Sequence, residues 1–210
     1  MEQNITSEQA AVLGKEVEHH LAWKMLHGIG GVAKDSKAAF NLAWKGYRLQ
    51  GCPHCQGVAA MCLRLQIERP RYPTEWQDLA RESSGSGSKY GQYVLGQLYE
   101  HGGRGVAKDD VQAVALYRLA AEQDLDEAQF SLGIMYSLGY GVDENEAEAL
   151  RCFQLAAAQG HPQALCQVAV SHDFGIGVPE NKDEAIRLYK LAQAAGSKAA
   201  ANHLRRLCAE

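Results

Sequence analysis

The chain alternates small, apolar and aromatic residues with polar residues at helical spacing. In residues 128–136 and 164–172, positions i, i+4 and i+8 fall on one helix face and carry mostly apolar side chains. Residues 113–120, 149–156 and 185–192 each begin and end with alanine and carry an aromatic residue at the fifth position. Small residues let helices approach closely, and aromatic rings fill the gaps between them. The pattern predicts pairs of packed helices, which we name helix A (the first of each pair) and helix B (the second).

A glycine motif separates helix A from helix B at a regular interval. Gly-x-Gly-Val occurs at 139–142 and 175–178, and a version with one extra residue occurs at 28–32 and 102–106. The valines of the last three copies are 36 residues apart. A period in this range is typical of a solenoid, in which each unit buries its apolar face only against its neighbours. Glycine ends a helix at such a place because it enters the left-handed conformation without steric cost.

Polar residues suited to capping a helix follow each glycine motif. Three residues beyond the valine, the chain places Asp35, Asp109, Asn145 and Asn181. Such side chains accept hydrogen bonds from the unpaired N–H groups at a helix start. Three residues further on, the last three copies carry Gln112, Glu148 and Glu184. This spacing predicts reciprocal capping boxes at the start of helix B, which should end near Gly160 or Gly196.

The repeated pattern resembles the Sel-1-like repeat family, a relative of the tetratricopeptide repeats. The family pattern runs Ala-x-x-x-Leu-Gly-x-x-Tyr-x-x-Gly-x-Gly-Val, then Asp or Asn, then Ala-x-x-x-Tyr-x-x-Ala-Ala-x-x-Gly. Residues 128–160 and 164–196 match it closely, and a third copy at 95–121 has Asp124 where the closing glycine is expected. The resemblance implies an all-α fold, a right-handed α-solenoid (superhelix) of antiparallel helix-turn-helix repeats. It also implies a non-catalytic scaffold or adaptor for a protein or peptide partner, without a cofactor.

We expect one solenoid domain over residues 1–210. Its predicted parts are repeat 1 at 5–50, a degenerate repeat 2 at 51–87, repeat 3 at 88–124, repeat 4 at 125–160, repeat 5 at 161–196 and a C-terminal capping helix at 197–210. Repeat 2 keeps the period but has Arg69-Pro70-Arg71-Tyr72-Pro73 in place of its glycine turn. Because proline restricts its own φ and the residue before it, we predict an extended loop over Glu68–Thr74.

The composition excludes some classes of partner. The formal net charge of −4 argues against a dedicated nucleic-acid binder, which would show a basic stripe. The first residues lack the basic and apolar regions of a signal peptide, and no apolar run reaches the roughly 18 residues of a membrane span. We therefore expect a cytoplasmic protein without direct membrane insertion, whose six cysteines are reduced thiols.

Cys52-Pro53-His54-Cys55 has the residues of a thiol oxidoreductase motif, which would gain reactivity at a helix start. Aligned with residues 160–164, this segment becomes the ordinary start of a helix A, with proline in the first turn and Cys55 at a small buried position. A zinc site would have Cys62 as a third thiolate and no second CxxC pair. The alignment favours packing, and a thiol-dependent redox or metal-binding function of Cys52 and Cys55 is the alternative.

Two other polar patterns are less specific. Ser86-Gly87-Ser88-Lys89 fits the Ser-x-x-Lys motif of penicillin-binding enzymes but has neither companion motif. His19-His20, with His27 and His101 at equivalent places, suggests metal binding, yet the sequence places no third ligand. We predict no catalytic residues and no metal ligands at these positions.

The face of helix A opposite the core is the candidate binding surface. In tetratricopeptide-like stacks the A helices line the concave wall, where partners usually bind. At about 100° per residue, Leu132 and Tyr136 point to the core and leave Phe130 and Ile134 roughly opposite. The predicted protein-binding row is Tyr93, Gln97, Phe130, Ile134, Cys166, Val170, Asn202 and Arg206. The alternative is that this row packs one A helix against the next.

Overall fold

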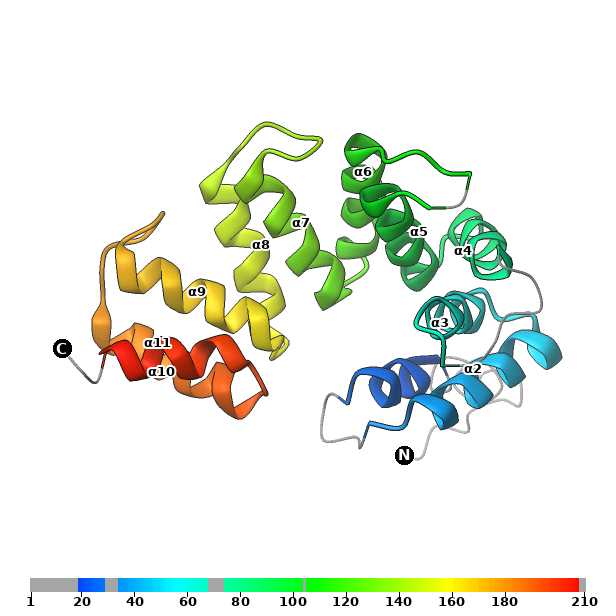
Figure 1. Ribbon diagram of the computed structural model, residues 1–210, viewed down its shortest axis with the longest axis horizontal. Helices are drawn as coiled ribbons and strands as arrows, with labels where there is room; N and C mark the ends of the chain where they lie inside the picture. The colour runs from blue at the N-terminus through cyan, green and yellow to red at the C-terminus, as the bar shows by residue number, and fades with distance from the viewer. Residues whose placement is uncertain (1–18, 29–33, 68–73, 104, 208–210) are drawn as a thin grey trace, which may run out of the picture. The chain divides into compact units, whose positions relative to one another are not determined.

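The computed structural model describes residues 19–28, 34–67, 74–103 and 105–207. Within these residues, 19–27 are helical and ten complete helices follow (Figure 1). They are α2 (Ser36–Gln50), α3 (Pro53–Arg64), α4 (Glu75–Gly85), α5 (Lys89–His101), α6 (Asp110–Ala121), α7 (Asp126–Leu138), α8 (Glu146–Ala158), α9 (Pro162–Phe174), α10 (Lys182–Ala194) and α11 (Lys198–Leu207). The described part of the chain has no strand beyond one isolated bridge between Gly103 and Val106, so the all-α prediction is confirmed.

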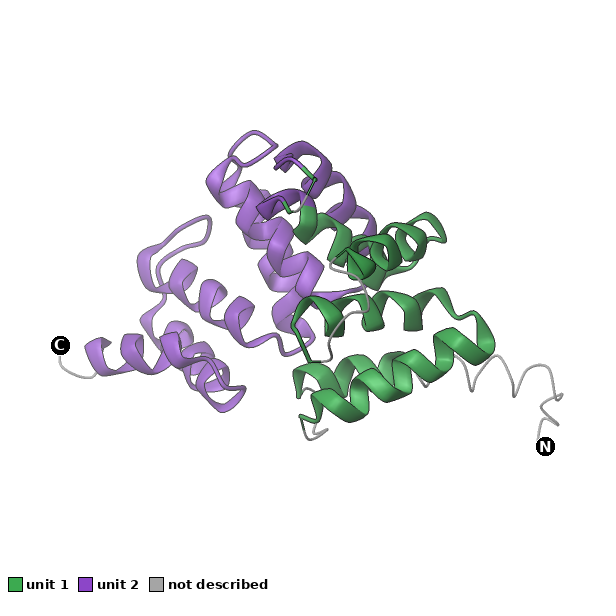
Figure 2. Cartoon of the chain, turned by 45° about the vertical axis from the view of Figure 1, so that its right-hand side comes forward, with its two compact units in different colours: residues 1–98, 103–106 green, residues 99–102, 107–210 purple. Residues whose placement is uncertain are grey.

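The chain forms two compact units (Figure 2). The first comprises residues 1–98 and 103–106, and the second comprises residues 99–102 and 107–210. In the first unit α3 packs against α2 and α4, and in the second unit each helix from α6 to α11 packs against the next one in the chain. This packing of consecutive helices is that of an α-solenoid, as predicted. One domain over 1–210, with the repeat boundaries given above, stays a prediction.

Each helix B in the second unit contributes a small residue and an aromatic ring to a buried seam. The pairs are Ala113 and Tyr117 on α6, Ala149 and Phe153 on α8, and Ala185 and Tyr189 on α10. Gly133 on α7 faces one of these rings, and a β-carbon at this glycine would lie 2.5 Å from the Phe153 ring. Atoms do not approach that closely in a packed interior, so glycine is what admits the ring between the two helices. The predicted packing of small against aromatic residues is confirmed.

All four predicted N-caps are present. The Asp35 side chain accepts a hydrogen bond from Ala38 N at 2.9 Å. The side chains of Asp109, Asn145 and Asn181 each accept one at 3.0 Å from the backbone N–H three residues later. Each cap therefore satisfies one of the N–H groups that a helix start leaves without a partner.

The return half of the predicted capping boxes is wrong. The backbone N–H of each N-cap donates instead to a carbonyl near the end of helix A. The pairs are Asp35 to Met25, Asp109 to Tyr99, Asn145 to Tyr136 and Asn181 to His172. The carboxylates of Glu148 and Glu184 bind arginines three residues on, Arg151 and Arg187. A backbone bond thus closes each glycine loop, and it spans one residue more in the two copies that carry the extra residue.

Residues in the left-handed conformation end both helices of a repeat. Gly139 after α7 and Gly175 after α9 have φ of 65° and 69°, as predicted for helix A. Gly160 and Gly196, which follow α8 and α10, have φ of 85° and 102°. In repeat 3 the equivalent residue is Asp124, which adopts φ of 57°. Asp124 keeps the turn that glycine makes elsewhere, although a β-carbon is strained in this conformation.

The second glycine of the motif in repeat 4 touches the preceding repeat. A β-carbon at Gly141 would lie 2.2 Å from the backbone oxygen of Asp110, at the start of α6. At Gly177, one repeat later, the nearest atom is the flexible tip of Leu150, at 3.3 Å. Glycine is therefore required at 141 for close approach as well as for its positive φ.

Two predicted loops fall outside the described residues, and two predicted helices fall within them. The glycine turn of repeat 1 at 29–33 and the extended loop at 68–73 lie outside the described residues. The helix start predicted at the CxxC segment is confirmed, because α3 begins at Pro53. A last helix is present where one was predicted, as α11 begins at Lys198. None of the helices described is both long and apolar enough to cross a membrane.

We expect Asp124→Gly to stabilise the protein. Glycine adopts the left-handed conformation without the steric cost of a β-carbon, although it also gains freedom in the unfolded chain. The free energy of unfolding, measured by urea denaturation, should rise by about 0.5–1 kcal/mol. Gly160→Asp, the reverse change at the equivalent place, should lower it by a similar amount. If Asp124→Gly has no effect while Gly160→Asp destabilises, contacts of the Asp124 side chain offset its strain. No effect of either change would contradict the strain assigned to this conformation.

Gly141→Ala should destabilise the protein far more than Gly177→Ala. Both positions have nearly the same φ, so both alanines meet the left-handed penalty of about 1–2 kcal/mol. At Gly141 the new methyl group also collides with backbone, which should add about 1–3 kcal/mol of overpacking. Urea denaturation of the two variants measures the difference. Equal losses would show that the loop of repeat 4 moves away from α6 at little cost.

Candidate functional site

Half of the predicted binding row packs between helices of the second unit. Phe130, Ile134 and Val170 are partly buried against a buried cluster of repeats 4 and 5, and Cys166 belongs to that cluster. The Phe130 ring stacks on the His161 ring, with centroids 4.7 Å apart. This packing is what the alternative interpretation of the row predicts, and binding through the exposed parts of these side chains stays a prediction.

The other four members of the row have polar partners of their own. Tyr93 and Gln97 lie in the first unit, where Gln97 Nε2 donates to Tyr93 OH at 2.9 Å. In the second unit Asn202 is exposed on α11 and accepts a hydrogen bond from Arg205 at 2.7 Å. Arg206 forms an ion pair with a buried carboxylate, described below.

A groove of about 300 Å³ lies between α6, α7 and α8. Its lining includes Arg118 of α6, Gln129, Leu132 and Tyr136 of α7, and Arg151 and Leu155 of α8. The three α7 residues share one helix face, and the sequence assigns two of them, Leu132 and Tyr136, to the core. Leu132 is buried as that assignment requires, whereas Tyr136 is only partly buried, so this face of α7 serves both the core and the groove.

The groove combines charged and apolar groups. Arg118 Nη2 donates to Tyr136 OH at 3.0 Å, and Arg151 Nε donates to Glu148 Oε2 at 2.9 Å. A guanidinium group carries five N–H donors, so both arginines keep donors for a bound group. Leu155 is 44 % exposed and forms an apolar part of the wall. The groove suits a ligand that joins an apolar side chain to a hydrogen-bond acceptor.

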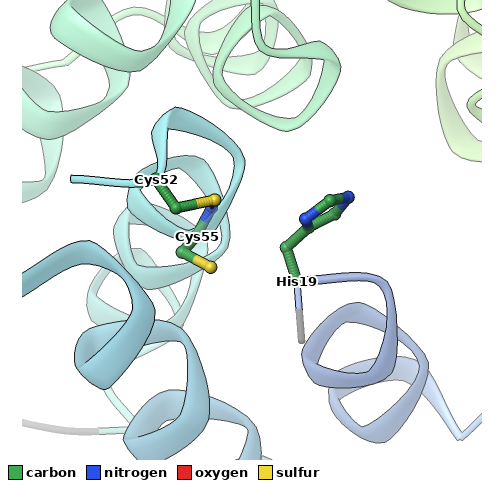
Figure 3. Close-up of side chains that lie close together, drawn as sticks. All are labelled: His19, Cys52 and Cys55. Atoms are coloured by element: carbon green, nitrogen blue, oxygen red, sulfur yellow. Dashed lines mark hydrogen bonds between the residues drawn. The ribbon is translucent and has the colours of Figure 1, made fainter. Parts of the chain in front are cut away.

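The structure brings His19 to the cysteine pair at the start of α3 (Figure 3). The ligand atoms of His19, Cys52 and Cys55 all lie within 4.8 Å of one another. Hydrogen bonds from Cys55 and from His19 hold the pKa of the Cys52 thiol well below its ordinary value, against the opposing effect of burial. Cys62 lies outside this group, and burial raises the pKa of its thiol to about 12. The third member is therefore a histidine, where the sequence suggests a third thiolate.

The Ser-x-x-Lys segment connects the end of α4 to the start of α5. Ser86 Oγ donates to Glu82 O at 3.0 Å, in the last turn of α4. Ser88 is buried, with its Oγ 3.0 Å from His54 Nδ1, and Lys89 is the first residue of α5. These contacts account for the segment by capping and packing.

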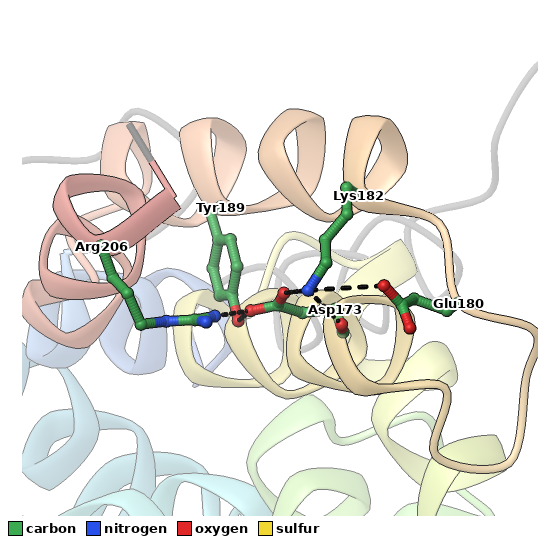
Figure 4. Close-up of polar contacts among 5 residues, drawn as sticks. All are labelled: Asp173, Glu180, Lys182, Tyr189 and Arg206. Carbon is green, nitrogen blue, oxygen red and sulfur yellow. Dashed lines mark hydrogen bonds and ion pairs between the residues drawn. The ribbon is translucent and has the colours of Figure 1, made fainter. Parts of the chain in front are cut away.

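A buried carboxylate ties repeat 5 to the last helix (Figure 4). The Asp173 side chain, near the end of α9, is fully buried and accepts hydrogen bonds from Lys182 Nζ at 2.8 Å and Tyr189 OH at 3.1 Å. Arg206 of α11 forms an ion pair with the same carboxylate. Burial alone would raise the pKa of Asp173, but the bonds from Lys182 and Tyr189 and the charge of Arg206 outweigh burial and lower it.

The acid on helix A and the tyrosine on helix B form a recurring pair. The equivalent pairs are Glu100 and Tyr117 in repeat 3, Ser137 and Phe153 in repeat 4, and Asp173 and Tyr189 in repeat 5. Tyr117 OH donates to Glu100 Oε2, as Tyr189 OH donates to Asp173. The acid is present where helix B carries a hydroxyl and absent where it carries a phenyl ring. Sequence reasoning missed this pairing, and comparison of the copies at these two places is the signal that would have found it.

The Sel1 repeat model matches four segments of the chain, at residues 16–49, 89–125, 126–161 and 162–197. The gap between the first two matches contains α3 and α4, in the repeat that the sequence marks as degenerate. No curated protein sequence matches the chain.

Solved structures share the fold. A Sel1 repeat protein from Oxalobacter formigenes is 23% identical with a TM-score of 0.72, over 93% of this chain and 79% of that one. A sel1 repeat protein from Klebsiella pneumoniae subsp. pneumoniae is 21% identical with a TM-score of 0.55, over 96% and 97%. The immunity protein Pa5087 from Pseudomonas aeruginosa is 21% identical with a TM-score of 0.56, over 90% and 71%. At these identities the similarity shows the fold alone.

Asp173→Asn should destabilise the protein at neutral pH by about 1–3 kcal/mol, because asparagine keeps the shape but loses the charge that Lys182 and Arg206 bind. The folded-state pKa of Asp173 lies below its ordinary value of 3.8. The stabilisation is therefore complete above that value and is lost as the pH falls through the folded-state pKa. Urea denaturation should show a gap between wild type and variant that narrows below about pH 4.

Asp183→Asn is the matched control, because this acid is exposed in the same repeat. The control should leave stability nearly unchanged at every pH. A gap between wild type and Asp173→Asn that persists undiminished in acid would contradict the role assigned to the charge.

Proposed function

The chain belongs to the Sel1 repeat family, and from this we propose that it is a non-catalytic scaffold or adaptor that binds a protein or peptide partner. Four segments match the family, whose members are generally protein-interaction scaffolds. The fold favours this use because stacked helix pairs offer an extended surface to a partner. A cytoplasmic location stays a prediction.

The groove between α6, α7 and α8 carries the proposal. Its volume of about 300 Å³ is enough for one or two side chains of a partner segment, since whole small-molecule pockets span about 300–1,000 Å³. Leu155 provides an apolar contact, and Arg118 and Arg151 provide donors from two neighbouring B helices. Arginine binds carboxylates in a bidentate geometry. We therefore expect a partner segment in which an apolar residue lies beside an acidic one.

The row predicted on the A helices is a second surface within this proposal. Ile134 and Val170 are partly buried, so a partner would contact their exposed edges while their inner atoms continue to pack against the core. Substitution in this row would change folding and binding together. Leu155 is the better test, because it is more exposed and has equivalents in other repeats.

Leu119, Leu155 and Leu191 hold the same place in α6, α8 and α10, and they are 47 %, 44 % and 45 % exposed. Of these three, Leu155 lines the groove. The three leucines thus share chemistry, helix position and exposure, and differ in the surface around them. Changes at Leu119 and Leu191 are matched controls for a change at Leu155.

Leu155→Glu should abolish capture of the partner, whereas Leu119→Glu and Leu191→Glu should retain it. A charge at the centre of a contact costs about 2 kcal/mol or more, which weakens binding roughly 30-fold. Affinity capture from native cells with quantitative mass spectrometry identifies proteins that follow this pattern. Circular dichroism of all three variants checks that the helices persist.

Each other pattern of capture has a distinct meaning. Equal loss in all three leucine variants would assign binding to a ridge along the B helices. Capture retained by all three would leave the A-helix row as the binding surface. A chain that captures no partner saturably would contradict the scaffold function. The double variant Cys52→Ser with Cys55→Ser should capture normally, and loss of an activity with capture intact would favour the thiol-dependent alternative.

A further inference from the structure

Three metal-binding groups from two separate segments meet in the first unit. Residues 19–27 form a helical segment that brings His19 to the start of α3, where the CxxC sequence supplies two thiols (Figure 3). One ring nitrogen of His19 and the sulfur atoms of Cys52 and Cys55 lie within 4.8 Å of one another. Ligand atoms around a tetrahedral zinc ion lie about 3.5–3.8 Å apart, given Zn–S bonds of about 2.3 Å and Zn–N bonds of about 2.0 Å. A zinc ion would therefore need the three ligand atoms to move about 1 Å closer together, which small side-chain rotations would allow.

The start of α3 places both sulfur atoms on the same side. Cys52 is the N-cap residue, Pro53 is the first helical residue, and Cys55 follows within the first turn. The Cys55 backbone N–H donates to Cys52 Sγ at 3.3 Å. The start of a helix favours negative charge, because its first backbone N–H groups point out of the N-terminal end and have no partner within the helix. This position therefore suits a pair of thiolates, which is the form in which cysteine binds a metal.

Two aromatic rings pack against His19, and each of them is held by a contact of its own. The His19 ring packs on the His54 ring, with centroids 4.7 Å apart, and meets the Tyr90 ring at 5.8 Å. His54 Nδ1 lies 3.0 Å from Ser88 Oγ, which fixes the position of that ring. Tyr90 is buried against Trp23, at 4.6 Å between centroids. Such outer contacts orient a ligand and limit the access of water, as around known metal sites.

We propose that His19, Cys52 and Cys55 bind a zinc ion. Thiolates and imidazole are the groups that zinc prefers in proteins, and three protein ligands leave the fourth tetrahedral position to a water molecule. Both cysteines bind as thiolates, so binding releases the thiol protons that remain. The ion would join the helical segment 19–27 to α3 and stabilise the first unit. The proposal goes beyond the scaffold function and does not depend on it.

A disulfide between Cys52 and Cys55 is the competing use of this sequence. Forming it requires an oxidant to accept two electrons from the thiols. It also makes no use of His19, which reaches the pair from outside the CxxC motif. The position of the histidine therefore favours metal binding.

The test uses the full chain, purified under reducing conditions and titrated with Zn²⁺. We expect one zinc ion per chain by elemental analysis, and a thiolate-to-metal charge-transfer absorption when Co²⁺ replaces zinc. His19→Ala and Cys55→Ser should each weaken Zn²⁺ binding more than about 100-fold, beyond the roughly 10–100-fold that loss of an outer contact costs. His101→Ala is the matched control, since this histidine is exposed at the end of α5 and should leave binding unchanged.

Four outcomes would overturn the proposal. The reduced chain could bind no stoichiometric zinc, or wild type and His19→Ala could bind zinc with equal affinity. The Co²⁺ complex could lack thiolate absorption, or the chain isolated without reductant could contain a Cys52–Cys55 disulfide in place of the metal. If Cys55→Ser fails to fold, the zinc affinity of His19→Ala and the Co²⁺ spectrum of the wild type still test the proposal. Removal of zinc with a chelator should also lower the thermal midpoint of the wild type and leave that of His19→Ala unchanged.

Discussion

Close approach between neighbouring helices is the constraint on which the rest of this structure depends. Its complete helices are 10 to 15 residues long, and a helix of that length is marginal in water by itself. Each must bury its apolar face against the next one. Glycine makes this possible at two kinds of contact, because Gly133 admits the Phe153 ring and Gly141 admits the backbone at the start of α6. The aromatic residues fill the space that small residues leave.

Polar bonds then set how the two helices of a repeat meet. The backbone N–H of each N-cap binds a carbonyl near the end of helix A, so the glycine loop is held at both ends independently of its side chains. Where helix B carries tyrosine, as at Tyr117 and Tyr189, an acid on helix A receives its hydroxyl. Repeat 4 has Phe153 and needs no acceptor. The buried polar atoms therefore vary in matched pairs, because a hydroxyl left without an acceptor would cost folding energy.

Features set by neighbours in sequence were predictable, and those set by the fold were not. The N-caps and the glycine helix ends depend on local backbone geometry, which short motifs encode. The return bond of the capping boxes does not form, because the backbone N–H of each N-cap donates to a carbonyl of helix A. The Glu148 carboxylate instead accepts a hydrogen bond from Arg151. The place of His19 beside Cys52 depends on how its helical segment packs against α3, and no repeat copy predicts that. The groove likewise needs the side chains of three helices at once.

The degenerate repeat departs from the family pattern in its polar residues and keeps the packing on which stacking depends. The family match leaves out α3 and α4. Ser83 of α4 lies four residues before Gly87, at the place that Ala156 holds before Gly160 in repeat 4. Ser83 is fully buried, yet its hydroxyl donates to Pro53 O at 2.6 Å and so costs little. A β-carbon at Gly57 would lie 2.5 Å from Gly91 N, so the backbones still meet at contact distance. Because the helices stay packed, the start of α3 can carry reactive side chains without loss of the stack, and this is where Cys52 lies.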